Sequence, residues 1–170
     1  MEQGDILEDC PVFSPPSDLT LNSSKDPEAE TLFEWERQDV IIMSQSCDLV
    51  KDREKVEDVL LCIIWNISEF VPEFVRTDLS EREIKEQLRK GQRPAFQMLN
   101  ECKLPNAERE FRVVDFRRTY TLPISFCRKF AENSSNRIRL LPPYREQLSQ
   151  AFARFFMRVG LPTDIPPFKK

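Results

Sequence analysis

Two runs of apolar residues mark the centre of the chain. The first is Val40-Ile41-Ile42-Met43, and the second spans residues 59–65. Short continuous apolar runs rich in β-branched residues are typical of strands that are buried on both faces. Only a short charged segment, residues 51–58, leads into the second run, so we predict two adjacent central strands.

A polar cluster follows the first run, at Ser44-Gln45-Ser46-Cys47-Asp48. A strand that ends in such residues can present reactive groups on a rigid scaffold. Ser and Asp also end strands for a local reason, because their side chains bond to nearby backbone groups. We favour the turn interpretation and keep Ser46, Cys47 and Asp48 as candidate binding residues.

Shorter patterns predict the remaining strands and loops. Strands are expected at residues 3–7, 31–36, 94–99, 111–123 and 136–141, with a slip or bulge midway through 111–116. A short helix is expected at 124–131. Residues 14–29, rich in Ser, Pro, Asp and Asn, indicate a mobile surface loop, and 68–74, which contain Pro72, indicate an irregular segment.

Two longer helices are predicted. The first lies near 78–90, where Asp78 or Ser80 can cap its start, Gly91 can end it, and a narrow apolar stripe places it at the periphery. The second lies near 143–159, after a Pro-Pro pair and before Gly160, and carries a wide apolar face that we expect to be core. The element order predicts one α+β domain over 1–170, a compact and mostly antiparallel barrel with helices at its edges.

The amino-acid composition limits which kinds of catalytic or metal site the chain can contain. The chain has no histidine and only three glycines, which excludes Ser-His and Cys-His pairs, HExxH zinc sites and glycine-rich phosphate loops. Five scattered cysteines without a CxxC argue against a disulfide framework or a zinc knuckle, and Cys62 is expected in the core. We therefore expect no metal and no cofactor.

Charge is unevenly distributed along the chain. Residues 1–58 contain 16 acidic and 5 basic side chains, whereas residues 59–170 contain 13 acidic and 20 basic ones. The basic part can form a nucleic-acid surface. Alternatively, the two halves face one another within one fold, or each forms a separate protein-binding face.

Five arginines are candidates for an RNA surface: Arg112, Arg117, Arg118, Arg137 and Arg139. Phe111 or Tyr120 could stack on a base, and Asp48 or Asp115 could act as a general base. The competing interpretation pairs these arginines with Glu110, Asp115 and the acidic N-terminal half. A third hypothesis makes Cys47 a reactive thiol, although the carboxylate of Asp48 beside it disfavours a thiolate.

Several landmarks together resemble one family. They are Gly4-Asp5-Ile6 at the first strand, the two central apolar runs, Arg117-Arg118-Thr119, and the terminal helix that closes on Gly-Leu. This pattern is similar to the MazF/PemK toxins, which are small SH3-like barrels that cut single-stranded RNA. The resemblance spans nearly the whole chain, and it implies an SH3-like barrel here.

The catalytic residues of that family have no clear counterparts. Its members use an Arg-Pro pair before the second strand and a Thr or Ser that ends the third. The first position falls near Gln38-Asp39, with Arg37 one residue away, and the second near Ile64 or Trp65, which carry no hydroxyl. Arg93-Pro94 is a literal Arg-Pro pair, but it follows the charged helix.

The resemblance therefore implies the fold of the family, but it gives little support to nuclease activity. Members of the wider group that lack the nuclease site occur as accessory proteins in bacterial phage-defence operons, some beside type III CRISPR proteases and sigma-factor regulators. We expect a non-catalytic protein-binding accessory or regulatory subunit in a stress or defence system, with RNA binding or MazF-type cleavage as the alternative. Its partner is expected to be a protein, with an operon-encoded regulator, a protease substrate or a sigma-factor complex as the candidates, and a homodimer is possible.

No apolar run approaches the roughly 20 residues that a membrane-spanning helix needs. The acidic N-terminus, with Glu2, Asp5, Glu8 and Asp9, does not resemble a signal peptide. We accordingly expect a cytoplasmic protein with no membrane partner.

Overall fold

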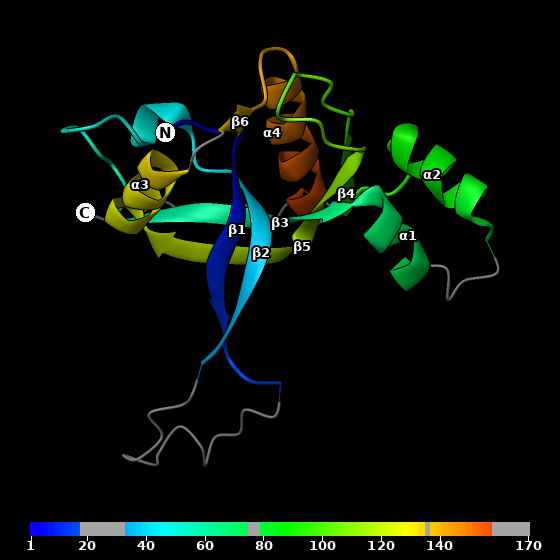
Figure 1. The fold of residues 1–170 in the computed structure, drawn as a ribbon, viewed down its shortest axis with the longest axis horizontal. Helices are drawn as coiled ribbons and strands as arrows, with labels where there is room; N and C mark the ends of the chain where they lie inside the picture. Colours follow the sequence, from blue (N-terminus) through cyan, green and yellow to red (C-terminus); the bar gives the residue numbers. More distant parts are fainter. Residues whose placement is uncertain (18–32, 75–78, 135–136, 158–170) are drawn as a thin grey trace, which may run out of the picture.

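One antiparallel sheet organises the structure. The computed structural model describes residues 1–17, 33–74, 79–134 and 137–157, and the six strands in these ranges are ordered β4-β5-β3-β2-β1-β6 (Figure 1). They are β1 (Asp5–Ser14), β2 (Glu34–Ile42), β3 (Asp58–Asn66), β4 (Phe96–Leu99), β5 (Arg112–Pro123) and β6 (Ile138–Arg139). The edge strands β4 and β6 do not pair with each other, so the sheet is a curled half-barrel. The predicted α+β class and antiparallel sheet are confirmed, whereas barrel closure is not observed.

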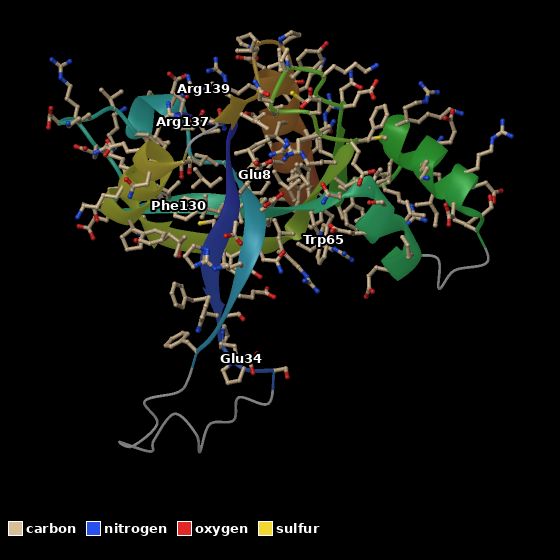
Figure 2. The ribbon with its side chains drawn as sticks, in the orientation of Figure 1. Glu8, Glu34, Trp65, Phe130, Arg137 and Arg139 are labelled. Atoms are coloured by element: carbon tan, nitrogen blue, oxygen red, sulfur yellow. The ribbon has the colours of Figure 1, made fainter. Side chains whose placement is uncertain are left out.

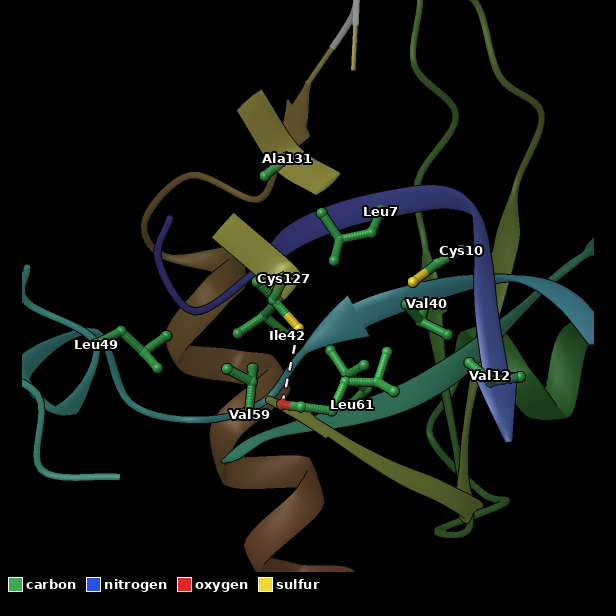
Figure 3. Close-up of a cluster of buried hydrophobic side chains, with 11 residues drawn as sticks. Leu7, Cys10, Val12, Val40, Ile42, Leu49, Val59, Leu61, Cys127 and Ala131 are labelled. Carbon is green, nitrogen blue, oxygen red and sulfur yellow. Dashed lines mark hydrogen bonds between the residues drawn. The ribbon is translucent and has the colours of Figure 1, made fainter. Parts of the chain in front are cut away.

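The two central apolar runs pair as predicted. Val40 lies opposite Ile63 and Ile42 opposite Leu61, which makes β2 and β3 antiparallel neighbours. Alternate side chains of a strand point to opposite faces, and here both faces are buried. Val40 and Ile42 join one hydrophobic cluster, shown in Figure 3, whereas Ile41 and Met43 join another.

A helix covers each face of these central strands. On one face, α3 (Ile124–Asn133) places Cys127 and Ala131 against the cluster that contains Val40 and Ile42. On the other, α4 (Tyr144–Phe156) places Leu148 against Ile41, with the rings of Phe152 and Phe155 packed around Phe116. The predicted aromatic face of the terminal helix is therefore core, except that Tyr144 and Phe156 are exposed.

Two further helices form a third cluster beside β4. Ser80, one of the two predicted caps, begins α2 (Glu81–Arg89) with a capping box, in which the Ser80 hydroxyl and the Glu83 carboxylate each accept from the other's backbone N–H. Residues 68–74 were wrongly predicted to be irregular. They belong to α1 (Ile67–Phe74), which includes Pro72 and buries Ile67, Phe70 and Val71. These three residues have the i, i+3, i+4 spacing of one helical face, and their burial outweighs the proline.

Several other predictions need correction or fall outside the described residues. Residues 31–36 and 40–43 were expected as separate strands, but Glu34–Ile42 is one strand whose exposed half tolerates polar residues. The last strand is only two residues long. Most of the predicted loop 14–29, the Asp78 cap, Asn136 and the helix end at Gly160 lie outside the described residues.

Irregularities in two strands accompany the curl of the sheet. In β1 the register shifts between Leu7 and Cys10, and Asp9 there has φ 56°, a left-handed conformation that Asp tolerates better than most residues. A second shift lies in the pairing of β3 with β5. Cys62 lies opposite Thr119, but the next residue, Ile63, lies opposite Asp115, so three residues of β5 have no partner on β3. Bulges of this kind bend a strand and increase its twist. The slip predicted midway through 111–116 is not there, because residues 112–115 pair regularly, and the shift comes just after them at 116–118.

The helix α4 provides a test of this packing. Leu148 is fully buried against the sheet, so Leu148→Ala leaves a cavity and should lower the free energy of unfolding by about 2–5 kcal/mol. Gln150→Ala, on an exposed position of the same helix, should change it by less than about 0.5 kcal/mol. Urea denaturation of the two variants makes the measurement, and equal small effects would contradict the placement of α4.

Candidate binding surfaces

The polar end of β2 is a loop anchor, as favoured from the sequence. The Ser46 hydroxyl accepts from the Gln3 backbone N–H at 3.1 Å, and Ser44 accepts from the Leu60 N–H at 2.8 Å. Asp48 lies 3.5 Å from the ammonium of Lys55. Residues Ser46–Asp48 form one turn of 3-10 helix that these contacts hold in place.

Two sets of predicted residues nevertheless meet in one cleft. Ser46, Cys47 and Arg137 line a cleft of about 440 Å³, which we call the Cys47 cleft. Its other lining residues are Met1, Glu2, Leu49, Val50, Lys51, Arg128 and Glu132. Arg128 closes the base of the loop, because it donates to the Leu49 carbonyl at 2.8 Å and pairs with Glu54. Among the described residues, neither Lys51 nor Arg137 has a carboxylate partner.

Cys47 differs from the buried cysteines. Burial raises the pKa of the Cys10 and Cys62 thiols to about 12 and that of Cys127 to about 11, so these three are inert packing groups. Cys62 lies in the core, as predicted. The Cys47 thiol is exposed and faces the carboxylate of Asp48 and the amide oxygen of Gln45. Nothing in this set of neighbours activates it as a nucleophile.

Arg112 is not on a surface. It is buried in β5, and its guanidinium lies 3.0 Å from the carboxylate of Glu8 in β1. Arg109 binds the same carboxylate through two nitrogens, at 2.7 Å each. The burial of Arg112 and its pairing with Glu8 agree with the competing interpretation, in which the candidate arginines pair with acidic residues of the N-terminal half.

Around Arg109 and Arg112, the pKa values of two carboxyl groups are shifted in opposite directions, down for Glu8 and up for Asp39. The hydrogen bond from Arg109 lowers the pKa of Glu8, against the opposing effect of burial. Burial raises the pKa of Asp39, whose carboxylate accepts the Asp9 N–H at 3.0 Å. The cluster contains no hydroxyl or imidazole that could act with these carboxyl groups, so its charges support the fold.

The other candidate arginines lie apart from one another. Arg139 pairs with Asp5 and Glu2. Arg117 pairs with Asp115 at 2.8 Å and lies over the Phe96 ring, while Arg118 lies over the ring of Trp65. Figure 2 shows Arg137 and Arg139 near β6, far from Trp65. The five arginines therefore do not form one continuous RNA surface.

These pairs join the acidic and basic halves of the chain. Glu8 with Arg109, Glu54 with Arg128 and Asp5 with Arg139 each connect a residue of the first 58 to one of the later residues. The interpretation that the two halves face one another within one fold is supported. Glu110 instead accepts a hydrogen bond from Ser68.

A surface on the ribbon formed by β1 and β2 was not predicted from the sequence. The ends of these strands project away from the rest of the sheet (Figure 1), and there Phe13 lies directly opposite Trp35. Phe13 is 51% exposed and Trp35 62%. The alternation around Phe33 and Trp35 was recognised as one face of a strand, but local pattern does not show whether a face is covered.

A groove between the two edges of the sheet was not predicted from the sequence either. Both β4 and β6 line a groove of about 520 Å³, together with the start of α4. Arg112 and Arg139 contribute to this lining, although both are engaged with carboxylates. Only the three-dimensional curl of the sheet brings these segments together.

The two arginines considered for the MazF-type Arg-Pro position have other partners. Arg37 pairs with Asp9 at 2.8 Å on the exposed ribbon, and Arg93 donates to the side chain of Gln87 at 2.9 Å. Within the described residues, no cluster of three or more His, Cys, Asp or Glu side chains could hold a metal ion. No described helix combines the length and apolarity needed to cross a membrane.

Comparison with known proteins does not assign the chain to a family. No family model, curated protein or solved structure matches it.

The Glu8 cluster makes a testable contribution to stability. Glu8→Gln leaves the buried Arg112 without a carboxylate and should reduce the free energy of unfolding at neutral pH by on the order of 2–4 kcal/mol. Because the folded-state pKa of Glu8 lies below its ordinary 4.5, the wild-type advantage should be complete above pH 4.5 and disappear as the pH falls through the folded-state value.

Urea titrations between pH 3 and pH 7 would measure this difference. Asp9→Asn is the matched control, because it removes the carboxylate of the exposed Asp9–Arg37 pair and should cost less than about 1 kcal/mol. A pH-independent difference for Glu8→Gln would show that the carboxylate charge is not what stabilises the cluster.

Proposed function

We propose that this chain is a non-catalytic protein-binding module on an SH3-like scaffold of the MazF/PemK type. The observation that carries the proposal is the pair of exposed aromatic rings, Phe13 and Trp35, on the projecting ribbon. Trp and other large aromatic residues dominate the binding energy of protein interfaces. A cross-strand aromatic pair is also rigid, so little conformational entropy is lost when it docks.

The opposite face of the ribbon is covered only on β1, at Val12, because Glu34 and Glu36 of β2 are exposed there. Val12, next to Phe13, is fully buried in the cluster beneath α3. Phe33, two residues before Trp35, is 67% exposed. We call these three exposed aromatic residues at the ends of the two strands, Phe13, Phe33 and Trp35, the aromatic ribbon. Neighbouring exposed apolar side chains mark interaction sites more often than isolated ones do.

Charges around the aromatic ribbon define the partner. Within the described part of the ribbon, the exposed acidic residues are Asp9, Glu34 and Glu36. Arg37 is the one basic residue of that part, and it pairs with Asp9. Glu34 and Glu36 lie on the face opposite Trp35. A partner protein with an apolar pocket bordered by Lys and Arg would complement this pattern. Raising the salt concentration should therefore weaken the association.

The resemblance to accessory members of phage-defence operons supports an operon-encoded partner, such as a protease or a sigma-factor regulator. RNA binding has less support from the structure. Arg112, Arg117 and Arg139 are paired with carboxylates, which reduces the positive charge available to phosphates.

A binding experiment with the whole chain tests the proposal. Products of the neighbouring genes would be passed over the immobilised wild-type protein and over a Phe13→Ser/Trp35→Ser double variant. Loss of the two rings should lower the affinity for the retained partner at least tenfold, because the apolar contact at the centre of the interface is removed. Isothermal titration calorimetry at two salt concentrations would measure it.

Leu104→Ser is the matched control, since Leu104 is a 64% exposed apolar side chain in the loop between β4 and β5. It should bind like the wild type, and circular dichroism should show that all variants are folded. Equal affinities for the double variant and the wild type would refute a role for the aromatic ribbon. Retention of single-stranded RNA in place of a protein would favour the alternative function.

A further inference from the structure

The open sheet has two free edges that border the same groove. Gln97, Met98 and Leu99 of β4 line one part of it, and Ile138 and Arg139 of β6 line another. Ile6 and Arg112, both buried, contribute from β1 and β5. An exposed strand edge presents backbone N–H and C=O groups in a row, which is a template for a further strand.

The ladder register shows which backbone groups are available on β4. The Phe116 N–H donates to the Ala95 carbonyl at 3.0 Å. Because hydrogen-bonded pairs alternate along an antiparallel ladder, Gln97 and Leu99 bond to β5, and the backbone groups of Met98 point away from it. In agreement, the Met98 carbonyl accepts a side-chain hydrogen bond from Gln97 at 3.1 Å.

The same reasoning applies to β6. The Leu140 N–H donates to the Gly4 carbonyl at 3.0 Å, and Ile138 lies opposite Ile6. Arg139 is therefore at a position where the backbone groups point away from β1. Within the described residues, neither the Met98 N–H nor the Arg139 N–H has a hydrogen-bond acceptor.

The charges of the groove are already neutralised. Arg112 is paired with Glu8, Arg139 with Asp5, and Arg89 with Glu86. Glu101 is paired with Lys103 at 2.6 Å. The remaining lining is largely apolar or amide, with Ile138, Leu140, Leu141, Met98 and Leu99 among it. A charged ligand would find no unpaired partner here.

From the edges, the register and the neutral lining, we propose that this groove binds an extended, uncharged peptide segment of a partner protein as an additional β-strand. Main-chain hydrogen bonds to Met98 fix the segment along the edge of β4, and its apolar side chains at alternate positions fill the groove between β4 and β6. The inference deepens the proposed protein-binding function and rests on it, but it uses a surface separate from the aromatic ribbon.

The test uses a phage-displayed library of random 12-residue peptides selected on the whole protein. Enriched peptides should have alternating apolar residues and no net charge, and their affinities would be measured by fluorescence polarisation. Met98→Pro removes the N–H that points to the free edge, a position where proline is tolerated in edge strands. It should weaken binding at least tenfold, whereas Met98→Ala should weaken it less than threefold.

A second measurement does not depend on the folding of a variant. Methylating alternate backbone nitrogens of the best peptide should abolish binding in one register and spare it in the other, since only one set of N–H groups faces the edge. Equal tolerance in both registers, enrichment of helical or charged peptides, or no enrichment would overturn the inference.

Two outcomes separate this inference from the proposed function. If partner capture requires Phe13 and Trp35 but is unaffected by Met98→Pro, the module binds proteins and the groove assignment is wrong. If neither change affects capture, both proposals fail. A concentration-dependent dimer that Met98→Pro disrupts would assign the edge to a second copy of this chain and overturn the partner peptide.

Discussion

The buried ion-pair cluster of Glu8, Arg109 and Arg112 is the interaction on which the shape of this molecule depends. Strands β1 and β5 are separated in the sheet by β2 and β3, yet Glu8 of β1 reaches Arg112 of β5 at 3.0 Å. The contact is possible only because the sheet curls, and the bulge between Leu7 and Cys10 bends β1 at this point. Once formed, the cluster favours the curl, since separating the strands would leave a buried guanidinium unpaired.

Two consequences of the curl define the binding surfaces. The edge strands β4 and β6 come to line one groove without pairing to each other. The distal ends of β1 and β2 extend beyond the curled part as a two-stranded ribbon, with Phe13 and Trp35 exposed on one face. Carboxylates of the acidic N-terminal half, such as Glu8, Glu54 and Asp5, also form ion pairs with arginines of the basic C-terminal half. Charges that are separated along the sequence are therefore paired within the fold.

The fold was predictable where local pattern determines structure. The runs at 40–43 and 59–65 identified the central strands because strands buried on both faces have few polar positions. The capping box at Ser80 and the aromatic face of α4 were likewise visible. The helix α1 was missed because Pro72 suggested a break, while the burial that stabilises Ile67, Phe70 and Val71 comes from distant residues such as Phe96 and Val113.

The binding surfaces were much less predictable, for a physical reason. Ser46 and Cys47 were candidates apart from Arg137, and the fold brings the three to one cleft, whereas Arg112 was expected on a surface although it is 3% exposed. Which arginine meets which carboxylate depends on contacts such as Glu8 with Arg109, which are 101 residues apart. Exposure of Phe13 and convergence of β4 with β6 also arise only from the assembled sheet.

The central claim is that this chain acts by holding a partner's extended segment against its open sheet. Hydrogen–deuterium exchange of the whole chain, alone and with the partner that the aromatic ribbon retains, tests it most directly. We expect exchange to slow at Met98, whose edge amide becomes hydrogen-bonded to the partner's segment. Unchanged exchange at Met98, with protection confined to the Cys47 cleft, would contradict it.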